Sequence, residues 1–401
     1  MKKEKVVLAY SGGLDTSFCV KYLTIEKNLE VHTILVNTGG FSEEELNEVG
    51  RRSEEMGAKS HKTVDVVNLY YQKCIRFLVY GNILKNHTYP LSVSAERVFQ
   101  AMSIAEAALD IDADYIAHGS TGAGNDQIRF DMIFHIMAPG IPVITPIRDL
   151  KLSREEEIDY LEKHGVKMDW KKSVYSVNQG LWGTSVGGKE TLTSNQTLPE
   201  EAYPSRITEK IERKIELHFD QGQFIGVDKR KFKNPVDAIN ELNEIASVYG
   251  IGRGIHVGDT IIGIKGRVGF EAAAPVLILK AHEALEKHVL TKWQIYWKEQ
   301  LANWYGMLLH EGQYLEPVMR NIETFLEDSQ ETVNGKVIVK LAPQRYEIIG
   351  IESENDLMNN KFGQYGEMPS NWSSDDARGF AKILANQISI FRQVNQENKK
   401  S

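Results

Sequence analysis

The segment from Ala9 to Ser17 combines the residue types best suited to binding a phosphate. It reads Ala9-Tyr10-Ser11-Gly12-Gly13-Leu14-Asp15-Thr16-Ser17. The two glycines allow a tight turn and leave backbone N–H groups unobstructed, and the hydroxyl side chains add donors beside the start of a helix. The segment lacks the lysine of a Walker A loop and the spacing of a GxGxxG fingerprint. It therefore predicts an anion-binding loop of another kind.

Asp15 adds a negative charge to this loop. A carboxylate facing a phosphate is repulsive unless a divalent cation bridges the two, so we expect Mg²⁺ with a pyrophosphate-like group near Asp15. No HExxH or CxxC pattern occurs, and a metal site built by the protein alone is not expected. The alternative is a plain strand-to-helix turn, but the clustering of donors favours the anion site.

A second candidate segment follows a short apolar run later in the chain. It reads Gly119-Ser120-Thr121-Gly122-Ala123-Gly124-Asn125-Asp126-Gln127-Ile128-Arg129-Phe130. Its hydroxyl, amide, carboxylate and guanidinium groups could recognise both ends of an amino acid. Taken alone, the segment could equally be a hairpin loop with a surface ion pair.

Both segments need a scaffold that brings them together, and the first 165 residues predict one. Short apolar runs typical of buried parallel strands cover 6–10, 31–36, 63–67, 115–118 and 142–145. Helical stretches lie between and after them, at 17–27, 42–56, 69–84, 94–109 and 153–164. The strict alternation of strands and helices along the chain predicts an α/β domain with a doubly wound parallel sheet. Both segments follow strands, so they should meet at one edge of that sheet.

The rest of the chain departs from this alternation. Residues 173–205 are rich in Ser, Thr, Gly and Asn and read as long ordered loops. Asn234-Pro235 should open a helix. Apolar residues from Leu290 to Leu308 step by three or four and define one face of a long helix, with Trp293, Trp297 and Trp304 in the core or at a subunit interface. Residues 336–340 and 345–351 resemble two antiparallel strands, and a last helix should run from about Ser374 to Val394.

Composition narrows the function classes. The 401 residues suggest roughly two to three domains at about 150 residues each. The net charge of -8 disfavours a protein that coats nucleic acid. Cys19 and Cys74 cannot form a disulfide scaffold, and the N-terminus has no apolar run long enough for a signal or a membrane span. We expect a cytoplasmic protein without nucleic-acid or membrane partners.

The first segment, with its Ser-Gly-Gly-Leu-Asp-Thr-Ser core, resembles the signature of the PP-loop ATP pyrophosphatases. Together with the second segment, it is similar to the argininosuccinate synthase family. Tyr89 to Ser94 match that family's Tyr-x-x-x-x-Ser segment, and Ser176 and Ser185 fall at its two substrate-loop serines. The resemblance implies a PP-loop, HUP-like domain and a carbon–nitrogen ligase that joins citrulline to aspartate through citrullyl-AMP, releasing AMP and pyrophosphate.

The resemblance also implies roles for individual residues. ATP would be bound by Ala9, Tyr10, Ser11, Gly12, Gly13, Leu14, Asp15, Thr16 and Ser17, and by the backbones of Val36 and Gly119. Citrulline would be bound by Tyr89, Ser94, Arg129, Ser176 and Ser185, and aspartate by Thr121, Asn125 and Asp126. Asp15, Asp126 and Arg129 would be the catalytic residues, with Arg129 pairing the citrulline carboxylate and Asp126 facing the aspartate ammonium. Lys172 is a weaker candidate for a phosphate contact.

Three positions depart from the family pattern. Ala123 stands where the family carries a lysine, Gly258 where a glutamate usually contacts citrulline, and Phe270 where a tyrosine does. Asp259 or Glu271 could substitute for the missing glutamate. Alternatively, the substrate is an N-acylated or otherwise modified citrulline.

The expected organisation has three parts. An ATP-binding domain covers 1–166, an α+β synthetase and assembly domain covers 167–365, and a C-terminal helical arm covers 366–401; the resemblance implies a homotetramer. No residue stands out as a general base, so catalysis should rest on placement and charge stabilisation. Other PP-loop adenylating enzymes, such as tRNA-modifying or amidotransferase types, and a non-catalytic ATP-binding sensor are the alternatives.

Overall fold

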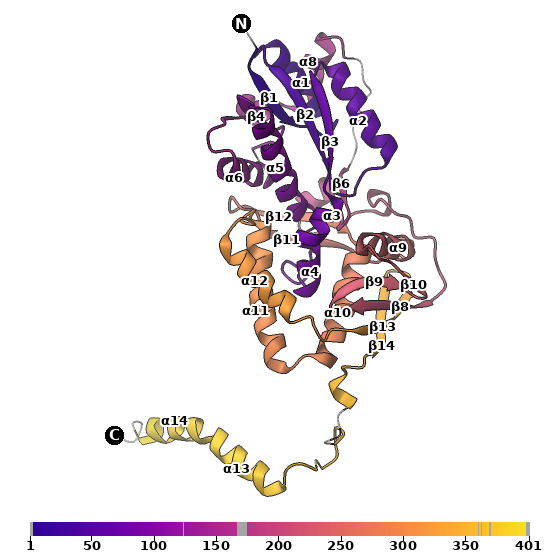
Figure 1. Cartoon of the computed structure of the whole chain (residues 1–401), viewed down its shortest axis with the longest axis vertical. Coiled ribbons are helices and arrows are strands. Elements are labelled where there is room, and N and C mark those ends of the chain that lie inside the picture. The colour runs from indigo at the N-terminus through magenta and orange to yellow at the C-terminus, as the bar shows by residue number, and fades with distance from the viewer. Residues whose placement is uncertain are drawn as a thin grey trace. The chain divides into compact units, whose positions relative to one another are not determined.

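The computed structural model describes residues 3–122, 124–166, 175–359, 361, 363–368 and 370–397. The contacts among them group the chain into two compact units, one ending at Glu354 and one beginning at Asn355. The first unit contains both candidate segments (Figure 1).

A parallel sheet forms the N-terminal part of the first unit. Its five strands lie in the order β3-β2-β1-β4-β5. Their bounds are β1 Lys5–Ala9, β2 Glu30–Asn37, β3 Ser60–Asp65, β4 Tyr115–Ala117 and β5 Val143–Ile144. The direction of winding reverses between β1 and β4, and a sheet of this type binds ligands at that point. The predicted doubly wound α/β domain is confirmed.

Helices cover both faces of this sheet because its inner strands β1 and β2 are apolar on both faces, whereas the edge strand β3 is polar and largely exposed. Val6 and Leu8 of β1 join one buried cluster with residues of α1 (Leu14–Ile25), α2 (Glu43–Met56) and α8 (Arg154–Lys163). Val7, one position along, joins the other cluster with α5 (Ser92–Asp110) and α6 (Asp126–Met137). Alternate residues of a strand point to opposite faces, so β1 contributes to both cores. The short helix α7 (Pro146–Leu150) follows β5.

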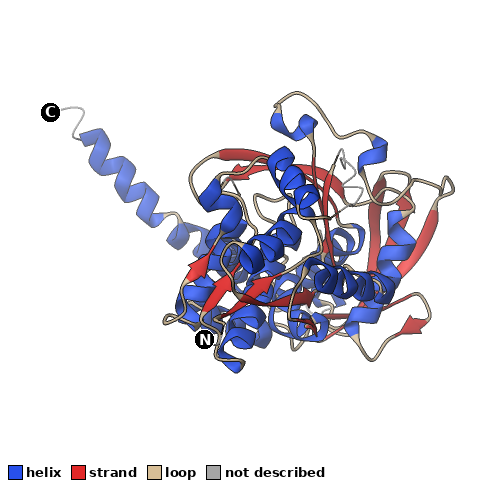
Figure 2. Ribbon diagram, turned by 90° about the horizontal axis from the view of Figure 1, so that it is seen from above, coloured by secondary structure: helices blue, strands red, loops and turns tan. Residues whose placement is uncertain are grey.

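Two antiparallel sheets lie in the remainder of the first unit. One has the strand order β10-β9-β8-β13-β14 and the other β11-β12-β7-β6. The strands of the first are β8 Arg213–Asp220, β9 Gln223–Val227, β10 Arg230–Lys231, β13 Gly335–Ala342 and β14 Arg345–Glu352. Those of the second are β6 Ser176–Gly180, β7 Gly183–Gly187, β11 Arg253–Asp259 and β12 Lys265–Glu271. Figure 2 shows helices distributed around these strands.

The second sheet brings the two halves of the unit together. Helix α5 packs against β1 and β2 of the parallel sheet and also against the hairpin of β6 and β7. The prediction of loops for residues 173–205 is therefore wrong for this hairpin. Its strands are rich in glycine and polar residues, and its stability comes from the fully buried Trp182 in the turn and from pairing with β12.

The other helices are α3 Val67–Tyr70, α4 Arg76–Tyr80, α9 Pro235–Ser247, α10 Ala273–Val289, α11 Lys292–His310 and α12 Pro317–Asp328. A π-helical turn from Tyr71 to Ile75 joins α3 to α4 within the predicted helix 69–84. Asn234 caps α9 through its side chain and Pro235 takes the first helical position, as predicted.

The periodicity of α11 identifies a helix face, but that face does not lie in the core of the unit. Trp293, Trp297 and Trp304 have side chains that are 56 to 63% exposed. Lys298, Ala302, Tyr305 and Leu309 are the buried side instead. The core alternative for the tryptophan face is therefore wrong, and the subunit-interface alternative stays a prediction.

In the described part of the second unit, two consecutive α-helices replace the single predicted one. They are α13 (Ser374–Leu384) and α14 (Asn386–Glu397), separated at Ala385. Ser373 caps α13 in a capping box with Asp376. No helix among the described residues is long and apolar enough to cross a membrane.

Candidate functional site

A cavity of about 930 Å³ lies at the carboxyl edge of the parallel sheet. Its walls come from the loops after β1, β2 and β4, from α5, and from the sheet that contains β6 and β11. The lining includes these predicted residues: Ala9, Tyr10, Ser11, Gly13, Leu14, Asp15, Thr16, Val36, Tyr89, Ser94, Gly119, Thr121, Asn125, Asp126, Arg129, Ser176 and Ser185.

The loop after β1 is shaped for an anion at the start of α1. Gly12 has φ +75°, a conformation that side chains rarely adopt, and Gly13 occupies the N-cap position without a capping side chain. The first-turn N–H groups of α1 thus remain available to a ligand. Gly12 and Ser17 do not line the cavity: Arg52 donates to the Gly12 carbonyl at 2.6 Å, and the buried Ser17 contacts the Tyr10 hydroxyl. Gly12 and Ser17 therefore shape the loop.

The second segment occupies the adjacent loop and the start of α6. Asn125 accepts a hydrogen bond through its side-chain oxygen from the backbone N–H of Ile261, at 2.8 Å. This bond ties the segment to the turn between β11 and β12, which is distant in sequence. Gln127 donates to the Gly122 carbonyl and so fixes the loop from within. Ala123 and Lys172 lie outside the described residues.

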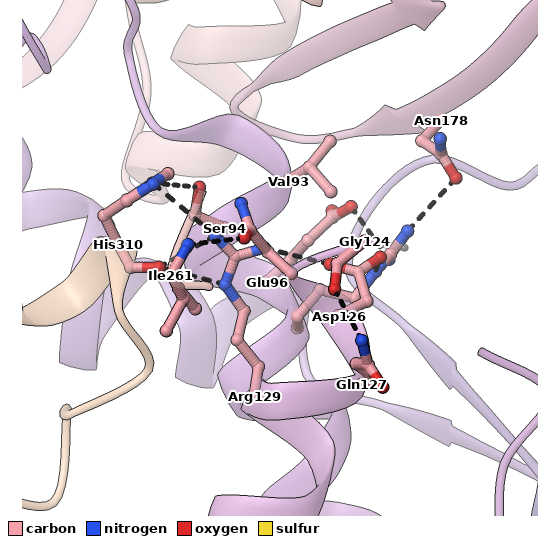
Figure 3. A network of polar contacts seen from close by, with 12 residues as sticks. Val93, Ser94, Glu96, Gly124, Asp126, Gln127, Arg129, Asn178, Ile261 and His310 are labelled. Carbon is pink, nitrogen blue, oxygen red and sulfur yellow. Dashed lines mark hydrogen bonds and ion pairs between the residues drawn. The ribbon is translucent and has the colours of Figure 1, made fainter. Parts of the chain in front are cut away.

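Asp126 lines the cavity and lies between two guanidinium groups (Figure 3). Arg97 Nε donates to one carboxylate oxygen and Arg129 Nη1 to the other, both at 2.9 Å. Burial alone would raise the pKa of Asp126, but the two guanidinium charges outweigh it and hold the pKa below its ordinary value. While Glu96 beside Arg97 is protonated, one carboxylate facing two guanidinium groups leaves a surplus of positive charge, which favours anionic ligands.

Glu96 is the second carboxyl group of this network. Thr38 Oγ1 donates to it at 2.9 Å, and Arg97 lies 3.3 Å away. Burial raises its pKa to about 7 in spite of both contacts. A Cβ at Gly180 would collide with the Glu96 carboxylate, so the β6 backbone approaches this group closely. Glu96 therefore changes its charge near neutral pH inside the cavity.

The end of the cavity beside Arg129 carries two histidines. The Arg129 guanidinium donates to the His310 backbone carbonyl through Nε at 3.0 Å and Nη2 at 2.8 Å. The His310 ring contacts Ser94 Oγ at 3.2 Å. Burial is the main cause, and the charge of Arg129 the second, of a pKa of about 3 for His310. Burial also lowers the pKa of His256. Both imidazoles are neutral at pH 7.

Two of the three positions that depart from the family pattern, Gly258 and Phe270, also lie at this end. The Tyr89 ring stacks on His256 at 5.3 Å and lies 5.6 Å from the buried Phe270. Gly258 lines the cavity. Glu271 does not replace a missing carboxylate there, because Arg253 and Ser205 bind it at 2.8 Å each. The idea that Glu271 substitutes at this site is therefore wrong.

Sequence reasoning missed several polar residues of the cavity. They are Thr38, Glu96, Arg97, His118, Asn178, His256 and His310. One local signal was available: Ser94, Arg97 and Gln100 recur every three residues in an otherwise apolar helix and share a face. The two histidines at the Arg129 end gave no local sequence signal. His256 is on a strand and His310 ends a helix, and both are far from the two segments in sequence.

Comparison with known proteins agrees with this geometry. Family models described as Arginosuccinate synthase N-terminal HUP domain and Arginosuccinate synthase C-terminal domain match residues 5–167 and 175–391. The chain is 36% identical over 394 residues to the argininosuccinate synthase of Dictyoglomus thermophilum, covering 98% of each chain. It is 36% identical to that of Methanocaldococcus jannaschii, covering 90% of this chain and 91% of the relative. Identity to the Xanthomonas campestris protein is 34%, over 99% of this chain and 100% of that one.

These matches extend over both halves of the first unit and include both candidate segments. The chain belongs to the argininosuccinate synthase family.

Proposed function

We propose that the protein is an ATP-dependent ligase that joins a citrulline-type ureido amino acid to aspartate, with AMP and pyrophosphate as co-products. The single observation that carries this proposal is the shared cavity. An anion-binding loop at the start of α1 and a carboxylate-guanidinium cluster at the start of α6 open into the same space. A nucleotide and two amino acids need such adjoining subsites.

The first step is attack of the ureido oxygen on the α-phosphorus of ATP. A new P–O bond forms while the bond to pyrophosphate breaks, and negative charge accumulates on the leaving group. The N–H groups around Gly13 and the hydroxyls of Ser11 and Thr16 stabilise that charge as it develops. This role requires no proton transfer by the loop.

In the second step the aspartate nitrogen attacks the activated ureido carbon, and AMP leaves with the oxygen. The amine must give up a proton, for which the phosphate oxygen of the departing AMP is an acceptor, and it needs a fixed position. Asp126 positions the amino group, while the guanidinium groups of Arg97 and Arg129 attract the carboxylates of the two amino acids. Asp15, Asp126 and Arg129 remain the proposed catalytic residues.

Mg²⁺ belongs to this proposal as the partner of the triphosphate. Among the described residues no group of three or more Asp, Glu, His or Cys side chains could hold a metal. One carboxylate, Asp15, together with the loop hydroxyls fits a cation that is shared with phosphate oxygens. When bound, the ion would neutralise phosphate charge.

The direct test is product formation from defined components. Protein, ATP, Mg²⁺, aspartate and a ureido amino acid should yield AMP and pyrophosphate in equal amounts, and omission of any one substrate should stop steady turnover. Asp126→Asn should lower the rate at least a hundredfold. Asp110→Asn, an exposed carboxylate at the end of α5, is the matched control and should retain the wild-type rate. Wild-type activity in Asp126→Asn would contradict the role of Asp126.

We further propose a cytoplasmic homotetramer whose functional parts span 1–166, 167–365 and 366–401. The match of separate family models on either side of residues 168–174 supports the first boundary. Exposed Trp297 on α11 and exposed Phe380 and Phe391 on α13 and α14 support burial between subunits. Sedimentation of the full chain tests assembly, and a monomer would contradict it.

A further inference from the structure

The Arg129 end of the cavity carries an unusual balance of charges and hydrogen-bonding groups. His256 lines the cavity and is only 5% exposed. Its Nδ1 atom is buried and has no hydrogen-bond partner. A buried imidazole nitrogen without a partner carries a free-energy cost that a ligand can remove. This atom identifies a contact that an occupant of the cavity should make.

Gly258 creates the space in which the His256 ring lies. The two residues are separated by one position on β11, so they share a face of the strand, and both are buried. A Cβ at position 258 would stand 2.5 Å from His256 Nε2. The imidazole therefore occupies the volume into which a side chain at 258 would extend, and a carboxylate cannot be placed there while His256 keeps this position.

No carboxylate among the described lining residues is free to pair with an ammonium at this end. Asp126 is paired with Arg97 and Arg129, and the proposed function assigns its remaining acceptor capacity to the amino group of aspartate. Asp259 occupies an exposed position of β11, on the face opposite His256 and Gly258, where it pairs with Lys265 at 2.7 Å.

The remaining carboxylates belong to other parts of the cavity. Glu96 is engaged by Thr38 and Arg97. Glu45 caps the start of α2 by accepting from the Ser42 N–H at 2.8 Å, and Asp15 belongs to the phosphate loop.

The charges around His256 and His310 are positive. Arg129 and Lys85 both act on His310, and Lys85 also acts on His256. A free α-ammonium in this position would be desolvated next to like charges without a counter-ion, which is strongly unfavourable. An amide is neutral and offers both a donor and an acceptor, so it can satisfy a neutral imidazole in either tautomer.

We propose that the ureido substrate of this enzyme is an N-acylated citrulline whose acyl amide hydrogen-bonds to His256. The inference rests on the proposed function, because it assumes that the substrate carboxylate pairs with Arg129. The α-carbon carries both the carboxylate and the nitrogen, so a carboxylate at Arg129 places the nitrogen among the groups beside that guanidinium. The product would be the corresponding N-acylated argininosuccinate.

The test compares the wild-type protein on three substrates. Pyrophosphate release is measured with ATP, Mg²⁺ and aspartate together with L-citrulline, N-acetyl-L-citrulline or N-succinyl-L-citrulline. At least one N-acyl compound should have a kcat/KM at least tenfold above that of citrulline. Equal or higher kcat/KM with citrulline would overturn the inference while leaving the proposed function intact. No pyrophosphate with any of the three would instead overturn the proposed function.

Variants of β11 test whether His256 and Gly258 set the preference for an N-acyl substrate. His256→Ala should raise KM for the N-acyl substrate at least fivefold, with little change in kcat or in ATP affinity. The double variant His256→Ala/Gly258→Glu provides both the space and a carboxylate, and it should shift preference towards free citrulline. Val257→Ala, on the exposed face of the same strand, is the control and should leave the preference unchanged. An unchanged preference in the double variant, with ATP binding retained, would contradict the assignment.

Discussion

Glu96 permits a quantitative prediction because a buried carboxyl group with a raised pKa links stability to pH. Its pKa is about 7 in the folded protein and about 4.5 when unperturbed. Between these values the unfolded chain has released the proton that the folded protein retains, so stability falls as pH rises. The contribution of the neutral carboxyl is fully present below pH 4.5 and is lost as the pH passes through about 7.

The size of this stability change follows from the difference between the folded and unfolded pKa values of Glu96. Each pKa unit corresponds to 1.36 kcal/mol, so the ionised group costs about 3 kcal/mol above pH 8. Glu96→Gln keeps a neutral group of the same shape at every pH. The variant should therefore be more stable than the wild type by about 3 kcal/mol at pH 8, and by less than about 1 kcal/mol at pH 5.

Melting temperatures measured at both pH values provide the assay. For a chain of 401 residues, an unfolding entropy of about 2.1 cal/mol/K per residue converts 3 kcal/mol into roughly 3 to 4 °C. Glu106→Gln, an exposed glutamate on the same helix, is the matched control and should show no pH-dependent difference. An equal shift for Glu96→Gln at pH 5 and pH 8 would refute the reasoning.

Three further outcomes are expected. Gly12→Ala should weaken ATP binding at least tenfold by calorimetry, because φ is +75° and the new Cβ would lie 3.1 Å from Val49 Cγ2; unchanged affinity would contradict a backbone role for this glycine. Ser42→Ala should lower the free energy of unfolding by about 1 kcal/mol through loss of the α2 cap, with turnover retained. A chain ending at Glu354 should form smaller assemblies than the full chain in sedimentation, and identical assemblies would exclude a role for the second unit.

The local sequence was sufficient for the scaffold of the nucleotide site. Continuous apolar runs alternating with helical patterns predicted a parallel sheet, and the loops after β1 and β4 had to meet because the carboxyl ends of parallel strands share one edge. The Asn234-Pro235 helix start and the hairpin of β13 and β14 were also predictable from local signals. The β6-β7 hairpin was not, because its stability depends on partners distant in the sequence.

The sequence by itself thus determined the sheet edge at which the two candidate segments meet, and it predicted an anion-binding role for the first of them. Periodicity in α11 revealed a face of tryptophans, but only the packed structure showed that the opposite face, with Lys298 and Tyr305, is buried. The tertiary structure alone brought His256 and His310 beside Arg129 and left one imidazole nitrogen without a partner. Residue type and spacing fix which groups are local neighbours, whereas the charge balance of a cavity depends on which distant groups become buried together.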